Sequence, residues 1–227
     1  MFNQLLSVFL EFPCELCHRP TDSDRHRNIS DRLCKYCSDR LLGHQLTHSD
    51  RLKLYQAQST FAWGKYGGEL KRAIAQMKYA RQPEIARITG TLLGQAWLDC
   101  GLVKLHPKIT VVPIPMHSQK QKLRGFNQAE IIASSFARVT GYRLNNKALI
   151  RVRNTAAMFE LTSLSARAKN LENALQVGSK LPKYPVLSID DIHTTGTTVK
   201  EAIKVLQAKK IKVVGVAVVA KAGFFNK

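Results

Sequence analysis

From residue 56 onward, short apolar runs alternate with longer stretches in which apolar side chains recur at helical spacing. A short apolar run bounded by Gly or Pro predicts a buried strand, and the longer spacing predicts a helix with one apolar face. Strands that alternate with helices are typical of the α/β class, with a mainly parallel sheet covered by helices. The strands are expected at residues 61–66, 109–112, 185–189 and 211–220, and the helices at residues 69–79, 84–103, 125–139 and 196–209.

Two parts of the chain depart from this pattern. Near the N-terminus, Leu5, Leu6, Phe9 and Leu10 suit one face of a short helix. Residues 145–180 are polar and weakly patterned, so we expect a loop-rich insertion there, with a helix near residues 165–174.

Four cysteines near the N-terminus form two pairs, Cys14 with Cys17 and Cys34 with Cys37. This spacing lets both thiolates of a pair reach one tetrahedral ion, so the pattern predicts a structural zinc site with four sulfur ligands. The polar segment between the pairs has too few apolar residues for a core of its own, which favours a module ordered by metal. Disulfides are the alternative, but they suit an exported protein better than one in a reducing compartment.

The charge is divided unevenly between the two domains that we expect, a zinc-ribbon-like module at residues 1–55 and a second domain at residues 56–227. The 227-residue chain has 35 Lys and Arg against 16 Asp and Glu, and residues 61–227 hold 27 of these basic and 9 of these acidic side chains. This excess of positive charge favours a polyanionic partner, although a solvated basic surface would have the same composition.

No apolar stretch of the sequence could cross a bilayer, because the longest, at residues 213–220, is far too short. The first residues also lack the cationic leader and the small-residue cleavage site of a secretory signal. We therefore expect a cytoplasmic protein without a membrane span.

The most informative segment follows the expected strand at residues 185–189. Two adjacent acids, Asp190 and Asp191, lead into a turn rich in hydroxyl groups, after which a helix begins. Ligands of open α/β sheets bind beyond the carboxyl ends of strands, and a helix start offers free N–H groups to an anion. Carboxylates beside such a site can accept hydrogen bonds from sugar hydroxyls, so the segment predicts a sugar phosphate as ligand. The turn consists of Thr194, Thr195, Gly196, Thr197 and Thr198.

A helix cap is the simpler explanation of the same segment. In that case Asp191 or Thr194 would cap the helix and the other threonines would fill the turn. Capping accounts for one acid and one hydroxyl, but it leaves the second acid and the remaining hydroxyls around Gly196 unexplained.

The acid pair and the turn resemble the phosphoribosyl-diphosphate signature of type I phosphoribosyltransferases. More closely, the chain is similar to the ComF family, also called the GntX family, which is linked to natural competence and DNA utilisation. Members of that family combine an N-terminal cysteine knuckle with a phosphoribosyltransferase-like domain. Besides the cysteines, the resemblance rests on VPIP at residues 112–115, LRGFNQA at residues 123–129 and RAKN at residues 167–170.

The resemblance implies roles for individual residues. Asp190 and Asp191 would hold the ribose hydroxyls, and the threonine turn would hold the 5-phosphate. Residues 113–117 would face a diphosphate that carries Mg²⁺, and residues 151–167 would form a flap over the substrate. The sequence departs from the signature at Ser188 and His193, where apolar or aromatic side chains are usual.

A departing diphosphate also needs cationic side chains to neutralise it. We expect Lys78, another basic candidate, to be a surface residue with its aliphatic stem packed against the protein. His117 and His193 lie next to polar turns, and we expect them to form hydrogen bonds rather than act as bases. The cationic side chains assigned to the ligand are Arg124, Arg151 and Arg153.

Three functions are compatible with the sequence. The first is a phosphoribosyltransferase-like competence protein that supports uptake or processing of transforming DNA and binds phosphoribosyl diphosphate or a related nucleotide. Single-stranded DNA and DNA-processing proteins would be its further partners. The second is an active Mg²⁺-dependent phosphoribosyltransferase of nucleotide metabolism or salvage, and the third is a zinc protein whose second domain is a scaffold. The resemblance favours the first function.

Overall fold

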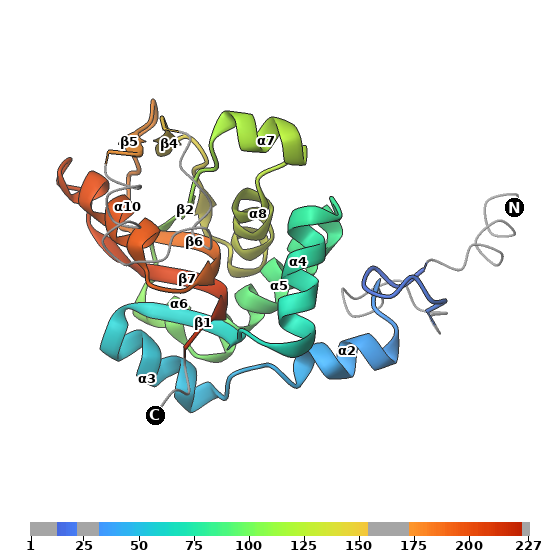
Figure 1. The fold of residues 1–227 in the computed structure, drawn as a ribbon. Coiled ribbons are helices and arrows are strands. Elements are labelled where there is room, and N and C mark those ends of the chain that lie inside the picture. The colour runs from blue at the N-terminus through green and yellow to red at the C-terminus, as the bar shows by residue number, and fades with distance from the viewer. Residues whose placement is uncertain (1–12, 22–31, 154–172, 224–227) are drawn as a thin grey trace, which may run out of the picture.

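The computed structural model describes residues 13–21, 32–153 and 173–223. Its strands are β1 (Thr60–Lys65), β2 (Thr110–Pro113), β3 (Arg143–Leu144), β4 (Leu149–Arg151), β5 (Leu175–Val177), β6 (Val186–His193) and β7 (Val213–Lys221). Five of them form one sheet in the order β1-β7-β6-β2-β3, in which all neighbouring strands are parallel (Figure 1). Strands β4 and β5 form a separate antiparallel pair.

Helices cover both faces of the large sheet, which gives the domain three layers (Figure 1). The helices are α2 (Lys35–Leu42), α3 (His48–Gln58), α4 (Gly68–Tyr79), α5 (Pro83–Asp99), α6 (Leu102–Leu105), α7 (Ser118–Arg124), α8 (Gln128–Thr140) and α10 (Thr197–Gln207). One face packs against α4, α5 and α8, and the other packs against α3 and α10.

The strands are apolar on both faces because successive side chains point to opposite sides of the sheet. In β1, Phe61 and Trp63 are buried in the core under α4, α5 and α8, whereas Ala62 between them packs with residues of α3 and α10. Strand β7 repeats this alternation with Val216 and Ala217. The sequence therefore shows a continuous apolar run instead of a polar and apolar alternation.

The chain leaves the sheet in opposite directions after β2 and after β6. The segment after β2 passes through α7 to α8 on one face, and the segment after β6 enters α10 on the other face. Since β2 and β6 are neighbours in the sheet, their connections diverge at the carboxyl edge. A crevice forms at such a point in open α/β sheets, and ligands bind there.

The expected strands and helices of the main pattern are confirmed, and with them the α/β class with a mainly parallel sheet. The expected helix at residues 84–103 is interrupted, because Gly101 adopts a left-handed conformation (φ 68°) between α5 and α6. The expected strand at residues 185–189 continues to His193, because its ladder with β7 includes Asp190, paired with Val218. Both acids therefore belong to β6 itself.

The sequence pattern did not predict several short elements of the structure. Helix α7 has no buried residue, so it carries no apolar face that a pattern could reveal. The region expected to be loop-rich, residues 145–180, contains the short strands β4 and β5. These elements are too short or too polar for periodicity to detect them.

Some expectations fall outside the described residues. These include the N-terminal helix with Leu5 and Leu10, the RAKN motif, and all but the last two residues of the helix near residues 165–174. Those last two, Asn173 and Ala174, are not helical. Among the helices that the structure describes, none is long and apolar enough to cross a membrane.

Helices α5 and α8 approach each other closely at Gly90. A Cβ atom at this position would lie 2.6 Å from the carbonyl oxygen of Ile132 and 2.9 Å from its Cα. These are backbone atoms of α8, which cannot move aside without shifting the whole helix. Gly90 is therefore required for the packing that supports α8 under the sheet.

We expect Gly90→Ala to destabilise the protein, although alanine is the better helix former by about 1 kcal/mol. Overpacking of this kind costs about 1–3 kcal/mol, which would lower the melting temperature by roughly 2–10 °C. Gln95→Ala, on the exposed side of the same helix, is the matched control and should melt close to the wild type. Thermal unfolding followed by circular dichroism tests this. A Gly90→Ala protein as stable as the wild type would contradict the close approach of α5 and α8.

Candidate functional site

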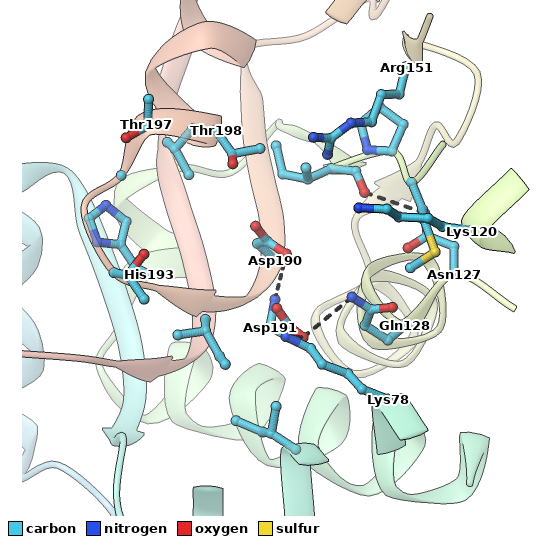
Figure 2. Close-up of a pocket in the computed structure, with 18 of the residues that line it drawn as sticks. Lys78, Lys120, Asn127, Gln128, Arg151, Asp190, Asp191, His193, Thr197 and Thr198 are labelled. Carbon is cyan, nitrogen blue, oxygen red and sulfur yellow. Dashed lines mark hydrogen bonds and ion pairs between the residues drawn. The ribbon is translucent and has the colours of Figure 1, made fainter. Parts of the chain in front are cut away.

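A pocket of about 460 Å³ opens at the carboxyl ends of β2 and β6. The turn after β2, helix α7, the start of α8, the end of α4 and the β6–α10 segment all contribute to its walls. Figure 2 shows Asp190 and Asp191 between two groups of side chains: Thr197 and Thr198 on one side and the basic residues of α7 and β4 on the other. The pocket lies at the crevice that the diverging connections create.

The structure brings most of the expected ligand residues into this one pocket. Both acids and all five residues of the threonine turn line it. Arg124 and Arg151 line it as well, whereas Arg153 is exposed and is not among the lining residues.

The start of α10 has the features of a phosphate site. Gly196 is the N-cap residue, with a left-handed conformation (φ 72°) and no side-chain cap. Among the described residues, no acceptor bonds the backbone N–H groups of Thr197, Thr198 and Val199. Neither Asp191 nor Thr194 caps the helix, so the simpler explanation by capping is wrong. The free N–H groups and the positive end of the helix dipole can hold an anion.

The two acids play different parts. Asp191 is buried, with 4% of its surface exposed, and its carboxylate lies 2.6 Å from the Lys78 ammonium nitrogen. The Gln128 side-chain amide donates a second, longer hydrogen bond of 3.4 Å to the same carboxylate. The backbone N–H of Asp191 donates to Asp190 at 2.8 Å. Asp191 is therefore already paired with a cation, whereas Asp190 lines the pocket and accepts the backbone N–H of Asp191.

Burial, and then the negative charge of Asp191, raise the pKa of Asp190 to about 7. Lys78 acts against this rise, but its ammonium is engaged with Asp191. Burial lowers the pKa of Lys78, but the charges of Asp191 and Asp190 and the hydrogen bond to Asp191 act together against burial, so that the pKa of Lys78 is raised overall. Hydrogen bonds from the hydroxyl groups of a ligand could therefore stabilise the charged form of the Asp190 carboxyl.

The side of the pocket opposite the threonine turn is basic. Lys120, Arg124 and Arg151 line it (Figure 2 labels the first and last). Arg124 donates a hydrogen bond of 2.6 Å to the side-chain oxygen of Gln128, and its guanidinium lies over the ring of Tyr79. We call these three residues the basic rim.

The prediction that Lys78 is a surface residue is wrong. Only 20% of its side chain is exposed, and the ammonium group points into the pocket toward Asp191 (Figure 2). The reason is that α4 ends at the carboxyl edge of the sheet, beside the crevice, so its last turn faces the acids.

Both histidines were expected to form hydrogen bonds, and His117 does, but the buried Nδ1 of His193 has no hydrogen-bond partner among the described residues. His117 precedes α7, and its ring Nδ1 accepts a hydrogen bond from the Gln119 backbone N–H. The ring of His193 lies against Gly196, where a Cβ atom would be 2.8 Å from Nε2. Burial, and then Lys221, lower the pKa of His193 and favour its neutral form.

Sequence reasoning missed four side chains of the pocket: Lys78, Lys120, Asn127 and Gln128. Two of them belong to the RGFNQA segment that carries the family resemblance. Asn127 caps α8 and donates a hydrogen bond to the carbonyl of Ile114, which ties the turn after β2 to that helix. That segment was a signal for the pocket, although its individual contacts depend on the fold.

The four cysteines of the N-terminal module lie together, with their sulfur atoms within 4.8 Å of one another. The sulfurs of Cys17 and Cys34 are 3.6 Å apart, and no disulfide joins any of the four. A tetrahedral ion with metal–sulfur bonds of about 2.3 Å needs sulfurs roughly 3.8 Å apart, so the geometry fits a metal such as zinc. Cys14 and Cys34 could hold it from a tight turn and from the start of α2, respectively.

Comparison with known proteins places the chain in a family. It is 28% identical over 207 residues to DNA utilization protein YhgH of Escherichia coli (strain K12), covering 85% of this chain and 83% of that protein. Competence protein F of Haemophilus influenzae is 30% identical over 161 residues, which cover 68% of this chain and 70% of that protein. The chain belongs to the ComF family.

A more distant ComF relative, competence protein ComFC of Bacillus subtilis, is 25% identical over 201 residues, covering 86% of this chain and 72% of that protein. No model of a protein family matches the chain. Among solved structures, UMP synthase of Leishmania donovani is 21% identical, with a TM-score of 0.35 over 67% of this chain and 24% of that one. That superposition is too loose to add to the assignment to the ComF family.

The raised pKa of Asp190 gives a prediction for stability. The folded protein holds this proton more tightly than the unfolded chain, so the free energy of unfolding should fall as the pH rises from about 4 to about 7. Asp190→Asn removes the effect, so the variant should be more stable than the wild type at pH 8, by about 1–3 kcal/mol, and similar to it at pH 4.

Urea unfolding of both proteins across this pH range measures the difference. Asp99→Asn, at an exposed acid remote from the pocket, should show no such pH-dependent gain. An Asp190→Asn protein less stable than the wild type at pH 8 would show that Asp190 is charged and well compensated in the fold.

Proposed function

We propose that this ComF-family protein binds phosphoribosyl diphosphate, or a related nucleotide, in the pocket at the ends of β2 and β6. The observation that carries the proposal is the order of charge across the pocket. An anion site at the start of α10 comes first, then the carboxyl of Asp190, then the basic rim. A ribose with a 5-phosphate and a diphosphate offers anion, hydroxyl groups and anion in the same order.

The position of Asp190 favours a sugar over a simple anion. A carboxylate in the middle of the pocket repels phosphate, but it accepts hydrogen bonds from hydroxyl groups. Asp191 is already paired with Lys78, so one acid, rather than two, would meet the ribose. This differs from the equal roles that the resemblance implies for the two acids.

Magnesium would bind through the ligand in this proposal. Within the described residues, the one group of His, Cys, Asp or Glu side chains gathered closely enough to hold a metal is the cysteine cluster. A Mg²⁺ ion in the pocket would therefore depend mainly on diphosphate oxygens, as Mg²⁺ often does with phosphate ligands.

The names of the relatives support a proposal for the biological role. Their names refer to DNA utilisation and competence, which favours a role in handling incoming DNA over an enzyme of nucleotide metabolism. We propose that the protein supports the uptake or processing of transforming DNA, and that its pocket senses or uses a phosphoribosyl ligand in that process.

We also propose that the cysteine cluster holds a structural Zn²⁺ and that residues 1–55 form the metal module, with the ligand-binding domain at residues 56–227. Four sulfur ligands close the coordination sphere, which suits a structural ion. Helix α3 spans the boundary and packs against β1, so the two parts share a core.

The proposed ligand predicts that one substitution changes the affinity for a sugar diphosphate and the affinity for diphosphate alone in different ways. Asp190→Asn should weaken the binding of phosphoribosyl diphosphate about tenfold or more, because a charge-assisted hydrogen bond contributes about 1.5–3 kcal/mol. It should leave inorganic diphosphate unaffected or bound more tightly, since a repelling charge is lost. Isothermal titration with both ligands measures this, and Asp99→Asn is the control.

Two results would contradict the proposal. One is no binding of phosphoribosyl diphosphate by the wild type in the presence of Mg²⁺. The other is an equal loss for both ligands in the Asp190→Asn protein, which would mean that the acid has no contact with the sugar.

A separate observation favours contact with nucleic acid. Six exposed lysines lie in the segments that precede β2, β6 and β7, and parallel strands begin at the same edge of a sheet. The segments at residues 102–109, 181–185 and 208–212 contain no Asp or Glu. The lysines, which we call the lysine edge, are Lys104, Lys108, Lys183, Lys209, Lys210 and Lys212.

Two contacts bring these segments together. The backbone N–H of Val186 donates to the carbonyl of Lys212 at 2.8 Å, which joins the segments before β6 and β7. The backbone N–H of Thr110 donates to the carbonyl of Pro185 at 2.8 Å, which joins the segments before β2 and β6. Exposed Leu105 and Leu181 lie in the same segments and could contact unstacked bases. We propose that the lysine edge binds single-stranded DNA.

Binding to a single-stranded oligonucleotide should therefore weaken steeply with salt, with a slope of log K against log [salt] of about −3 to −4 for five or six phosphate contacts. Changing Lys209, Lys210 and Lys212 together to Ala should reduce the slope by about 2. Changing Lys53 and Lys71 to Ala, at exposed sites elsewhere, is the control. Fluorescence anisotropy at several salt concentrations measures this, and affinity that does not change with salt would contradict the proposal.

A further inference from the structure

The cysteine module is docked on helix α4 through its first pair of cysteines. The carbonyl oxygen of Leu16, between Cys14 and Cys17, accepts hydrogen bonds from Arg72 at 2.8 Å and from Gln76 at 3.1 Å. Both donors are side chains of α4. A single carbonyl of the metal-binding turn is thus held by two positions one turn apart on that helix.

The second pair of cysteines adds contacts to the same region. Arg40 of α2 forms an ion pair of 3.6 Å with buried Glu69 in the first turn of α4, and Arg32 pairs with Glu84 in the first turn of α5. Buried Cys37 and Leu41 belong to the same apolar core as α4. In Figure 1, α2 accordingly lies against the α4–α5 side of the domain. The module therefore contacts α4 at several points.

The other end of this connection is the pocket. Lys78 lies two residues after Gln76 on α4, a rise of about 3 Å, and pairs with Asp191 at 2.6 Å. Just beyond it, Arg81 donates to the carbonyl of Leu123 at 3.0 Å, and Tyr79 lies under Arg124 of the basic rim. The last turn of α4 thus positions charges on two sides of the pocket.

We propose that the metal-bound cysteine module is a brace that sets the position of Lys78, and through it the affinity of the pocket for an anionic ligand. Lys78 is a positioning residue, because it acts on the pocket through Asp191. This inference rests on the proposed ligand, and it adds a regulatory link: the state of the metal site changes ligand binding at a distance.

The charges near Lys78 determine whether displacing it strengthens or weakens the binding of an anion. Asp191 is buried, and among the residues that the structure describes its one other side-chain donor is Gln128, through a long hydrogen bond. An unpaired carboxylate beside Asp190 would make the pocket more negative and repel phosphate groups. Loss of the brace therefore weakens binding of an anion, and it also exposes the Lys78 amine to solvent.

The test uses the full-length zinc-loaded protein and the variant Arg72→Ala/Gln76→Ala, which removes both donors to Leu16 and keeps good helix formers. Lys71→Ala, an exposed neighbour on the same helix, is the matched control. The first readout is the rate at which acetic anhydride labels Lys78, measured by mass spectrometry relative to exposed Lys204. This readout needs no ligand. The second readout is the dissociation constant for phosphoribosyl diphosphate.

We expect the double variant to retain one zinc per chain, to label at Lys78 at least threefold faster than the wild type, and to bind the ligand about five- to tenfold more weakly. Removing zinc from the wild type with a chelator should change both readouts in the same direction. The Lys71→Ala protein should match the wild type in both.

Unchanged labelling of Lys78 in the double variant and after zinc removal would overturn the brace, whatever the ligand does. Suppose instead that the wild type binds the ligand and that Lys78 is labelled faster in the double variant. If both proteins then have the same dissociation constant, the link to the pocket is overturned. If the wild type binds no phosphoribosyl diphosphate, the proposed ligand fails, and the labelling rates still show whether the module positions Lys78.

Discussion

A buried carboxylate needs a partner, and much of this structure is arranged to provide one for Asp191. Strand β6 carries two acids in succession, and burial, followed by the charge of Asp191, raises the pKa of Asp190. Lys78 from α4 and Gln128 from α8 meet Asp191 at the point where β6 ends. Three elements from different parts of the chain must therefore converge for the acid pair to be tolerated, and the pocket is the space that remains between them.

The parts of the fold that could be predicted are those set by local sequence. Apolar runs identify the central strands because both faces of the sheet are covered, and helical spacing identifies α4, α5, α8 and α10. The threonine turn, which we propose as an anion site, could be identified from the sequence, since its glycine, its hydroxyls and the helix that follows are adjacent in the chain. The cluster of four cysteines was predictable for the same reason, from the spacing of the two pairs.

The parts that could not be predicted depend on contacts between distant segments. In the sequence, Lys78 has no feature that distinguishes it from other lysines at the end of an amphipathic helix. Its ion pair with Asp191 depends on the position of α4, which ends beside β6. Helix α7, which brings Lys120 to the basic rim, has no apolar face to reveal it. The length of β6 depends on pairing with β7, which extends the strand beyond the apolar run and places the acids inside the sheet.

Helix α10 is one straight element of 11 residues, about 16 Å long. Its first turn lies at the carboxyl edge of the sheet, where we propose the anion site, and Lys209 and Lys210 follow its last turn at the amino edge. The two ends are too far apart to touch the same small molecule. A small ligand at Gly196 and an anion at these lysines would therefore contact opposite ends of one helix, and neither would block the other.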